Sequence, residues 1–439
     1  MQTFSPERKG EKGTMRRKIL CTFLLFCVSV QAAALAPPPA EFWAKRRPAR
    51  AANGARPEAS ARGQTRALWP GSRFTEADRR RAVMRGLDFI YRTALDPANF
   101  EDYGHDYLWC FYSLSAAVRD PAARRAARRM GVERARFWRR THRSVPTEAD
   151  AGTIANLAYG ADAADSLGLR DPELKKQLAR AAARFTARDY LLFDPRVEPP
   201  PADVPDECGR CGTWNARGSQ VCAVCRSPLV MRTRYDVWYD ALITAYVGER
   251  SGIPLGARYA DVLKWLPTLR PYSARPADAG EEFHDTVYAV THVVYTLNDY
   301  SQYRLSPRLL PQEFEFLKAN LRAAIADDDA DMLGEFMDSL RAFGMTTGDP
   351  LMRDGMEYYL THQNPDGSWG DTQEKDIYMR YHPTWNAVAG LSEYNWRGEG
   401  LSFPEVRPLL EQWAGAEPGS VSKAAAGRMI DRQGLRPQR

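Results

Sequence analysis

The feature that most constrains this chain is a helix start that recurs along most of its length. The first turn of a helix has free backbone N–H groups that an aspartate side chain can bind, and proline fits the first helical position. Such starts occur at Asp120-Pro121, Asp171-Pro172, Pro254, Pro311, Asp349-Pro350 and Pro404. The pattern predicts a series of helices with a period of roughly 40 to 55 residues, which is typical of repeat proteins.

Two kinds of helix alternate in this series. The helices that begin at these signals, together with one from about residue 76 to 93, are amphipathic and strongly charged. The helices between them are richer in Ala, Tyr, Leu and Val, and are predicted at 105–118, 150–167, 236–250, 284–299, 331–343 and 383–396. The simplest closed arrangement is an all-α (α/α)6 toroid with the apolar helices inside. Hydrophobic residues make up 44% of the chain, which is enough for such a core.

The N-terminal region predicts export. Residues 15–36 combine a basic start, an apolar run and an Ala-rich end, so residues 1–36 are interpreted as a signal peptide with an upstream extension. The alternative is a membrane anchor that is never cleaved. We expect a secreted or periplasmic protein with no membrane span in its mature form.

The remaining boundaries follow composition. Residues 37–73 are rich in Arg, Pro and Ala and predict a disordered linker. The toroid is expected in two parts, 74–202 and 231–413, separated by an insertion at 203–230 and followed by a flexible tail at 414–439. The net charge of +6 comes with no nucleic-acid recognition motif, so no nucleic-acid partner is expected.

One segment links the repeat to a known superfamily. Gln363, Gly367 and Trp369 in "QNPDGSW" form a pattern that resembles the QW motif, Q-x3-G-x-W, of squalene and terpenoid cyclases. These belong to the α/α toroid superfamily, which also includes the protein prenyltransferase β subunits. The resemblance covers about residues 74–413 and implies that the Gln and Trp tie the end of an outer helix to its neighbour. Cyclases of this kind carry an acidic D-x-D-D motif where this chain reads "ADDDADM", residues 326–332.

The insertion carries four cysteines. Cys208, Cys211, Cys222 and Cys225 have the spacing C-x2-C-x10-C-x2-C, which can present two pairs of thiolates to one tetrahedral Zn²⁺. The pattern resembles zinc ribbons and RanBP2-type fingers, and a four-Cys site has no open position, so its role would be structural. The alternative is a pair of disulfides, which an exported protein would permit.

The expected starts of the inner helices gather polar residues. In a toroid these helices begin at the same end of the barrel, so their first turns would converge on one mouth. His105, Asp106, His284, Asp285 and His382 are the predicted site there. His292, two turns deeper, would line the wall of the same cavity. Helix capping explains an Asp at a helix start, but it does not require a His beside it.

Several chemistries fit these residues. His105, His284 and His382 could hold a second divalent metal, Zn, Fe or Mn, for metal-assisted catalysis. Alternatively, His and Tyr could act as acid and base without a metal, as in toroidal polysaccharide lyases or glycosidase-type enzymes, with Trp109, Trp238 and Trp385 stacking on sugar rings. The remaining hypotheses are an isoprenoid cyclase and a non-catalytic toroid that binds a ligand. The substrate, whether a small molecule, a peptide or a glycan, is not specified by these residue types.

Overall fold

The computed structural model describes residues 66–272 and 281–414, apart from positions 203, 207, 209, 212, 214 and 217. The predicted signal peptide, most of the predicted linker and all but the first residue of the tail lie outside these ranges. Most of the described chain is helical, which confirms the all-α prediction. The helices are α2 Glu76–Leu95, α3 Pro97–Ala117, α4 Pro121–Thr141, α5 Ala151–Ser166, α6 Pro172–Ala182, α7 Ala187–Leu191, α8 Arg234–Ser251, α9 Tyr259–Leu263, α10 Leu266–Leu269, α11 Glu281–Leu297, α12 Pro311–Ala326, α13 Ala330–Ala342, α14 Pro350–His362, α15 Tyr378–Leu391, the 3-10 helix η2 Pro404–Val406 and α16 Arg407–Ala414.

Most of the predicted helix starts are present, with the expected caps. Asp120, Asp171 and Asp349 each accept hydrogen bonds from backbone N–H groups of the first turn, ahead of a proline. Pro254 does not start a helix, and the next helix, α9, begins only at Tyr259. The reason is Gly256, which has a φ of +89° and passes so close to α7 that an added Cβ would lie 2.9 Å from Ala187 Cα.

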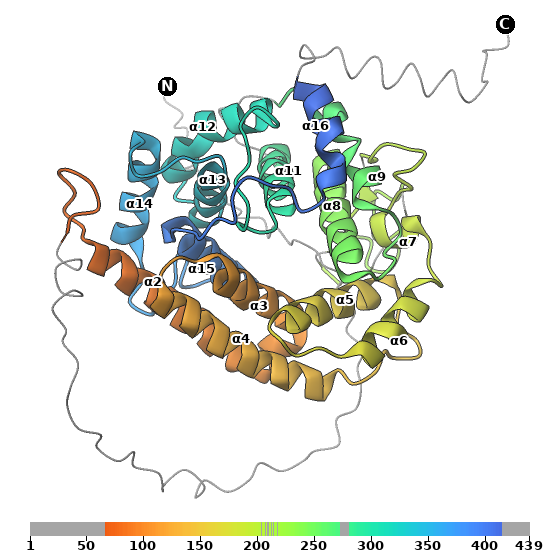
Figure 1. The fold of residues 1–439 in the computed structure, drawn as a ribbon. Helices are drawn as coiled ribbons and strands as arrows, with labels where there is room; N and C mark the ends of the chain where they lie inside the picture. Colours follow the sequence, from red (N-terminus) through yellow and green to blue (C-terminus); the bar gives the residue numbers. More distant parts are fainter. Residues whose placement is uncertain are drawn as a thin grey trace, which may run out of the picture.

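Six helices pack against one another in sequence. Contacts join α3 to α5, α5 to α8, α8 to α11, α11 to α13, α13 to α15, and α15 back to α3. These helices lie inside the others in Figure 1, with α2, α4, α6, α12 and α14 around them. The inner positions match the helices predicted to be apolar.

Burial separates the two groups. All but one residue of α13 is buried, including Glu335, Asp338 and Arg341, so this helix is enclosed on every side. By contrast α4 buries residues at the three- and four-residue spacing of a single helix face, from Ala123 to Trp138, and exposes most of its arginines. Helices of the second kind therefore cover helices of the first kind.

The first and last helix pairs are joined by the segment that resembles a QW motif. Gln363 donates from Nε2 to the carbonyl oxygen of Ala82 in α2 at 2.9 Å, and Arg85 of α2 donates to Gln363 Oε1 at 3.2 Å. Trp369 is 1% exposed and donates from Nε1 to the carbonyl oxygen of Tyr359 in α14 at 2.9 Å. The contacts tie the end of α14 to α2, which begins more than 250 residues earlier.

The cysteine insertion is bracketed by two short strands. β1, Val204–Pro205, pairs antiparallel with β2, Met231–Arg232. The ladder brings the two ends of the insertion together where α8 begins. The insertion is therefore a loop anchored at its base on the start of an inner helix.

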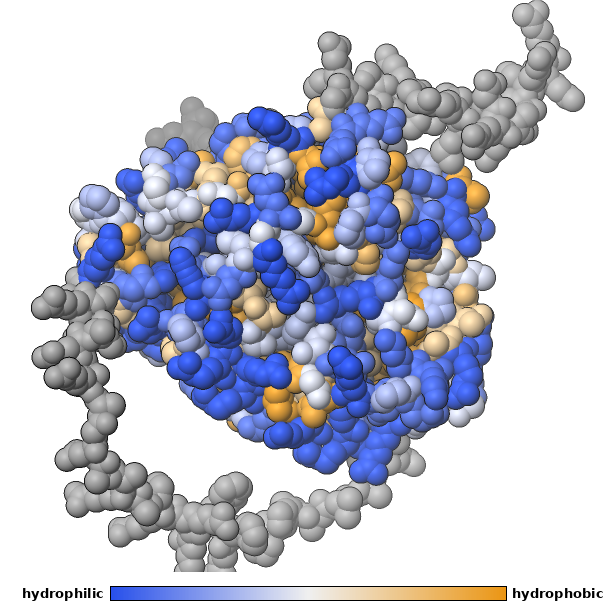
Figure 2. Space-filling model, viewed as in Figure 1, coloured by the Kyte–Doolittle hydropathy of each residue, from blue (hydrophilic) through white to orange (hydrophobic). Residues whose placement is uncertain are grey.

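The surface is mostly hydrophilic on the face drawn in Figure 2, with small separate apolar patches. Within the described ranges, no helix combines the length and the apolar character needed to cross a bilayer. The large apolar side chains found exposed are Leu95, Val197, Val221, Val224 and Val230. Three of these five residues, Val221, Val224 and Val230, belong to the cysteine insertion. The insertion therefore has little core of its own.

The close contact between α13 and α15 predicts how a larger side chain there would affect stability. An added Cβ at Gly334 in α13 would lie 2.4 Å from the backbone oxygen of Asn386 in α15. Because backbone cannot yield as a side chain can, Gly334→Ala should lower the free energy of unfolding by about 1–3 kcal/mol in urea titrations. The control is Gly348→Ala in an exposed loop, where the nearest atom would be Thr346 Oγ1 at 3.3 Å. Equal stability of the two variants would contradict close packing of α13 on α15.

Candidate functional site

A central cavity lies among the inner helices. Its volume for water-sized molecules is ≈ 80 Å³, enough for several waters or a slender group. Each of the six inner helices contributes to its wall. The polar and aromatic lining residues are Asp102, Tyr103, His105, Asp106, Ser113, Tyr159, Tyr239, Asp240, His292, Tyr295, Tyr300, Ser301, Glu335, Asp338, Asp376, Tyr378, His382, Trp385, Asn386 and Tyr394.

The cavity is elongated along the helix axes. Its wall includes both Asp102 and Ala117 of α3, which are ~22 Å apart at 1.5 Å per residue. Asp102 is exposed at the start of α3, whereas Ala117 is buried at its end. The cavity therefore opens toward the end of the molecule where the inner helices begin.

Carboxyl groups dominate the titratable side chains of the cavity wall. Among the described residues that line it are six carboxyl groups and three histidines, but no lysine or arginine. Eight further lining side chains are Tyr or Trp. Such a wall favours ligands that donate hydrogen bonds, carry positive charge or present a flat face to an aromatic ring.

A buried His–Asp pair joins α15 to α13. His382 donates from Nδ1 to Asp331 Oδ1 at 2.8 Å. Asp331 also accepts from Asn386 Nδ2 at 2.9 Å and from the Tyr288 hydroxyl at 2.8 Å. Burial opposes both charges, but the Asp331 carboxylate raises the pKa of His382 to about 9, and His382 in turn lowers the pKa of Asp331. The structure thus favours an ionised Asp331 beside a cationic His382.

A second carboxyl group lies one turn further along α13. Glu335 Oε2 accepts a short hydrogen bond from the Thr291 hydroxyl, and Glu335 Oε1 lies 3.4 Å from Asn386 Nδ2. Burial, followed by the negative charge of Asp331, raises the pKa of Glu335 to about 8. Two carboxyl groups that share one amide are therefore driven to opposite protonation states, an arrangement typical of acid–base sites.

Asp106 lines the cavity from α3. Its Oδ2 accepts from the Tyr381 hydroxyl at 2.7 Å, and burial raises its pKa. His382 opposes this rise through its positive charge. Asp106 is thus a carboxyl group of increased basicity near the cationic imidazole.

Two other lining histidines are neutral. Burial lowers the pKa of His105 and of His292 to about 4. His292 Nδ1 lies 2.8 Å from the carbonyl oxygen of Tyr288, which assigns its proton to Nδ1 and leaves Nε2 as the acceptor. The ring of His292 also stacks on Tyr239 at 5.2 Å. At neutral pH both imidazoles are therefore uncharged, so each can act as a base but not as a cationic acid.

The predicted site residues separate into two groups. His105, Asp106, His292 and His382 line the central cavity, as a shared site requires. His284 and Asp285 do not line it, which corrects their predicted place. His284 Nε2 is 4.0 Å from Asp329 Oδ2, and Asp285 is 6% exposed and accepts from the Thr233 hydroxyl at 2.8 Å. Both residues connect the starts of neighbouring helices.

The predicted aromatic contacts also divide. Trp385 lines the cavity, but Trp109 and Trp238 are fully buried. Trp238 donates to the carbonyl oxygen of Val262, and Trp109 stacks on Tyr159. These two tryptophans pack between helices and do not present a face to a ligand.

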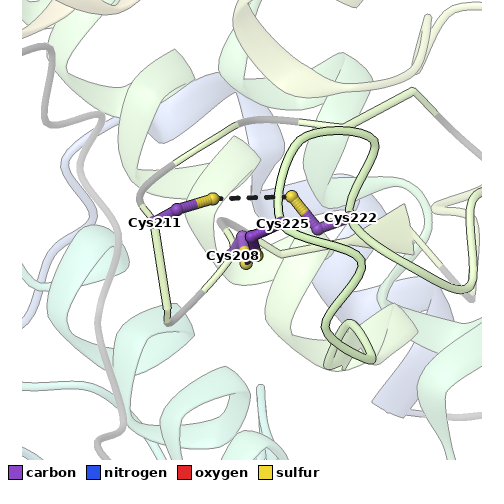
Figure 3. A group of neighbouring side chains, drawn as sticks. All are labelled: Cys208, Cys211, Cys222 and Cys225. Atoms are coloured by element: carbon purple, nitrogen blue, oxygen red, sulfur yellow. Dashed lines mark hydrogen bonds between the residues drawn. The ribbon is translucent and has the colours of Figure 1, made fainter.

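One group of side chains is arranged to bind a metal. In the described ranges, only Cys208, Cys211, Cys222 and Cys225 bring three or more ligand atoms together, all within 4.8 Å of one another. Figure 3 shows these side chains gathered between two loops of the insertion. His105, His284 and His382 form no such group, so the predicted second metal centre has no set of converging ligands here.

The four cysteines are not disulfide-bonded. Sulfur–sulfur distances of 3.5 Å join Cys208 to Cys225 and Cys211 to Cys222. A tetrahedron with ~2.3 Å metal–sulfur bonds has edges of ~3.8 Å, so the spacing suits a four-thiolate metal site. Backbone N–H groups, first that of Cys225, lower the pKa of Cys222 to about 6, whereas burial and the thiols of Cys225 and Cys211 raise the pKa of Cys208 to about 11.

Comparisons with protein-family models, with curated proteins and with solved structures give no match to this chain. The likeness of Gln363, Gly367 and Trp369 to a QW motif therefore stays a resemblance. Function has to be inferred from the chemistry of the site itself.

Glu335, Asp331 and Asn386 were missing from the predicted site. Glu335 follows Asp331 by one helical turn inside a helix predicted to be buried, and a carboxyl group in such a helix is itself a signal. Asn386 lies one turn after His382 on the helix predicted at 383–396. Spacing along each helix could have identified Glu335 and Asn386 separately. It could not have shown that the two side chains meet between α13 and α15.

The raised pKa values predict how stability changes with pH. The folded state holds protons on Glu335 and His382 up to about pH 8 and 9, whereas the unfolded chain releases them near 4.5 and 6.5. The folded state therefore binds more protons between pH 6.5 and 9, and its stability must fall as pH rises through this window. At about 1.4 kcal/mol per proton and pH unit, we expect a fall on the order of 5 kcal/mol in the free energy of unfolding, measured with urea.

The matched variant is Glu335→Gln, which resembles the protonated acid at every pH. It should lose the share that Glu335 contributes, about a third of the pH dependence, whereas Glu315→Gln on the exposed face of α12 should retain all of it. A wild-type stability that is constant or rises between pH 6.5 and 9 would contradict the assigned protonation states.

Proposed function

We propose that the protein is an α/α-toroid enzyme that uses metal-free acid–base chemistry on a neutral or basic glycan. The observation that carries this proposal is the cavity wall, in which a protonated Glu335 and a cationic His382 stand among carboxyl groups and tyrosines without a lysine or arginine. The toroid itself is supported by the contacts that lead from α3 through α15 and back to α3. Export, as expected from residues 1–36, remains part of the proposal.

The charge of the wall distinguishes between glycan chemistries. A lyase that acts on uronic acids must neutralise the substrate carboxylate, usually with a cationic side chain or a metal. Here the lining residues supply six carboxyl groups, and the cationic His382 is already paired with Asp331. Hydroxyl and amino groups of neutral or basic sugars, by contrast, can donate to these carboxyl groups while the rings stack on Tyr103, Tyr378 or Trp385.

The same wall disfavours an isoprenoid substrate. A hydrocarbon chain would cover six carboxyl groups and three imidazoles with apolar surface and make no polar contact with any of them. The metal-assisted alternative requires converging ligands, and the histidines do not provide them. Glycoside hydrolysis needs only a proton donor and a base on the two sides of the bond.

The residues have distinct proposed roles. Glu335 would donate its proton to the leaving glycosidic oxygen, and Asp106 would accept a proton from the attacking water, whose oxygen bonds to the anomeric carbon. Asp331 does not line the cavity and acts through His382, which it holds cationic and in place. Asn386 positions Asp331 and Glu335 together by its side-chain amide.

Substrate screening tests this proposal. Purified protein is incubated with oligosaccharides of neutral, amino and uronic sugars, and products are identified by mass spectrometry. We expect cleavage with addition of water for neutral or amino sugars, and a loss of about 10²–10⁴-fold in kcat for Glu335→Gln and Asp106→Asn. Glu315→Gln serves as the control and should retain full activity. Cleavage of uronic substrates to unsaturated products would instead establish a lyase.

We also propose that the cysteine cluster binds one structural Zn²⁺. Cys208, Cys211, Cys222 and Cys225 would supply all four ligands, so the ion takes no part in the reaction. Metal analysis of the full-length protein should find one zinc per chain, lost in Cys208→Ser and Cys225→Ser but retained in Cys110→Ser. The far-UV circular dichroism of the ligand variants should stay helical, because the insertion lies outside the inner helices. Absence of zinc together with four oxidised cysteines would support disulfides instead.

A further inference from the structure

The cysteine insertion connects to the cavity through a buried arginine. Arg232 belongs to β2, the strand on which the insertion ends, and is 7% exposed. Its guanidinium donates to Asp236 at 2.6 and 3.1 Å and makes a short hydrogen bond to Asp240 Oδ2. Both aspartates belong to the first two turns of α8. A side chain from the strand that closes the insertion thus bridges two acidic side chains at the start of an inner helix.

Asp240 is part of the cavity wall. Its Oδ1 is buried and has no hydrogen-bond partner, so Arg232 supplies the hydrogen bond that the carboxylate receives. Burial raises the pKa of Asp240 to about 7, with Arg232 lowering it and the neighbouring charges of Asp236 and Asp206 raising it further. The charge of this carboxyl group therefore depends closely on the position of one guanidinium.

Backbone hydrogen bonds lead from the cysteines to Arg232. The loop of the second cysteine pair is closed by Leu229, whose N–H donates to the carbonyl oxygen of Gln220 at 3.1 Å. The next bond joins Asp206 N–H to the carbonyl oxygen of Val230 at 2.9 Å, and the β1–β2 pairing follows directly. Arg232 is the last residue of this ladder.

The ladder is too short to be stable alone. Each strand has two residues, and Val221, Val224 and Val230 are exposed rather than packed in a core. Two-stranded hairpins of this size are marginal in water, and small cysteine-rich segments commonly fold only when metal is bound. Metal binding by the cysteines is therefore expected to determine whether β2 stays paired.

We propose that Arg232 is a positioning residue that holds the Asp240 side chain in the cavity wall only while the cysteine cluster binds metal. When the metal leaves, β2 separates from β1 and the guanidinium withdraws. Asp240, left buried beside Asp236 and Asp206, then takes up a proton. Thr233, the next residue, donates to Asp285 of α11. Separation of β2 from β1 would therefore also weaken a contact with a second inner helix. The inference rests on metal binding by the cluster, but not on the reaction proposed for the cavity.

Linkage makes the proposal measurable without any substrate. If metal binding stabilises the pair of Arg232 with Asp240, the pair must stabilise metal binding to the same extent. Zinc affinity of the full-length protein is measured by competition with a chromophoric chelator under reducing conditions. Arg232→Gln should weaken zinc binding by about 5–150-fold. Arg232→Lys, which keeps the charge, should recover part of the loss.

The matched control is Arg234→Gln, two residues along the chain. Arg234 is exposed, and within the described part of the chain its guanidinium contacts the adjacent Tyr235, so its loss should leave zinc affinity unchanged. Asp240→Asn removes the charge from the other partner and should weaken zinc binding as Arg232→Gln does. Far-UV circular dichroism of all variants checks that the helices remain folded.

Hydrogen exchange supplies the second measurement. Removal of zinc from the wild type should speed exchange of backbone amides in residues 231–240, and α13 should not change. Equal zinc affinities of Arg232→Gln and Arg234→Gln, or unchanged exchange at 231–240 after zinc removal, would overturn the proposal. A protein that does not bind zinc at all would refute the metal site itself. Failure of the metal site is thus distinguishable from failure of the coupling through Arg232.

Discussion

The contact between α13 and α15 is the interaction on which the rest of the site depends. Gly334 lets the two backbones approach until only a hydrogen fits between Gly334 Cα and the Asn386 carbonyl. The approach brings the Asn386 amide within reach of both Asp331 and Glu335, and His382 within 2.8 Å of Asp331. A larger residue at position 334 would separate these groups. The electrostatics of the cavity are therefore set by a packing constraint.

Burial then gives these groups their unequal protonation. A buried carboxyl group without a cation tends to keep its proton, whereas one with a hydrogen-bonded cation loses it. Glu335 and Asp331 lie one turn apart on the same helix, and only Asp331 contacts His382 directly. Asp240 is intermediate, because burial raises its pKa and the hydrogen-bonded Arg232 lowers it. The cavity thus combines proton donors and acceptors because some of its carboxyl groups have a cation beside them and others do not.

Much of the helical framework could be predicted from the sequence, because its signals are local. An Asp followed by Pro satisfies the first turn of a helix wherever it occurs, and α4, α6 and α14 begin as expected. Long-range contacts override such signals at Gly256, where proximity to α7 prevents a helix at Pro254. The helix predicted from residue 383 begins at Tyr378 instead, with Pro383 inside it.

The site was predictable only in part. Polar residues at helix starts indicated His105, Asp106 and His382, but the same signal included His284 and Asp285, which bond to neighbouring helix starts instead. Which way a side chain turns depends on helix rotation, and the repeat does not specify it. Glu335 was overlooked because its partner Asn386 comes from another helix.

Neutron diffraction from crystals grown near pH 7 would test the protonation of this centre most directly. The account predicts deuterium on the Glu335 carboxyl group and on both ring nitrogens of His382, with none on Asp331. An ionised Glu335 beside a neutral His382 would contradict it.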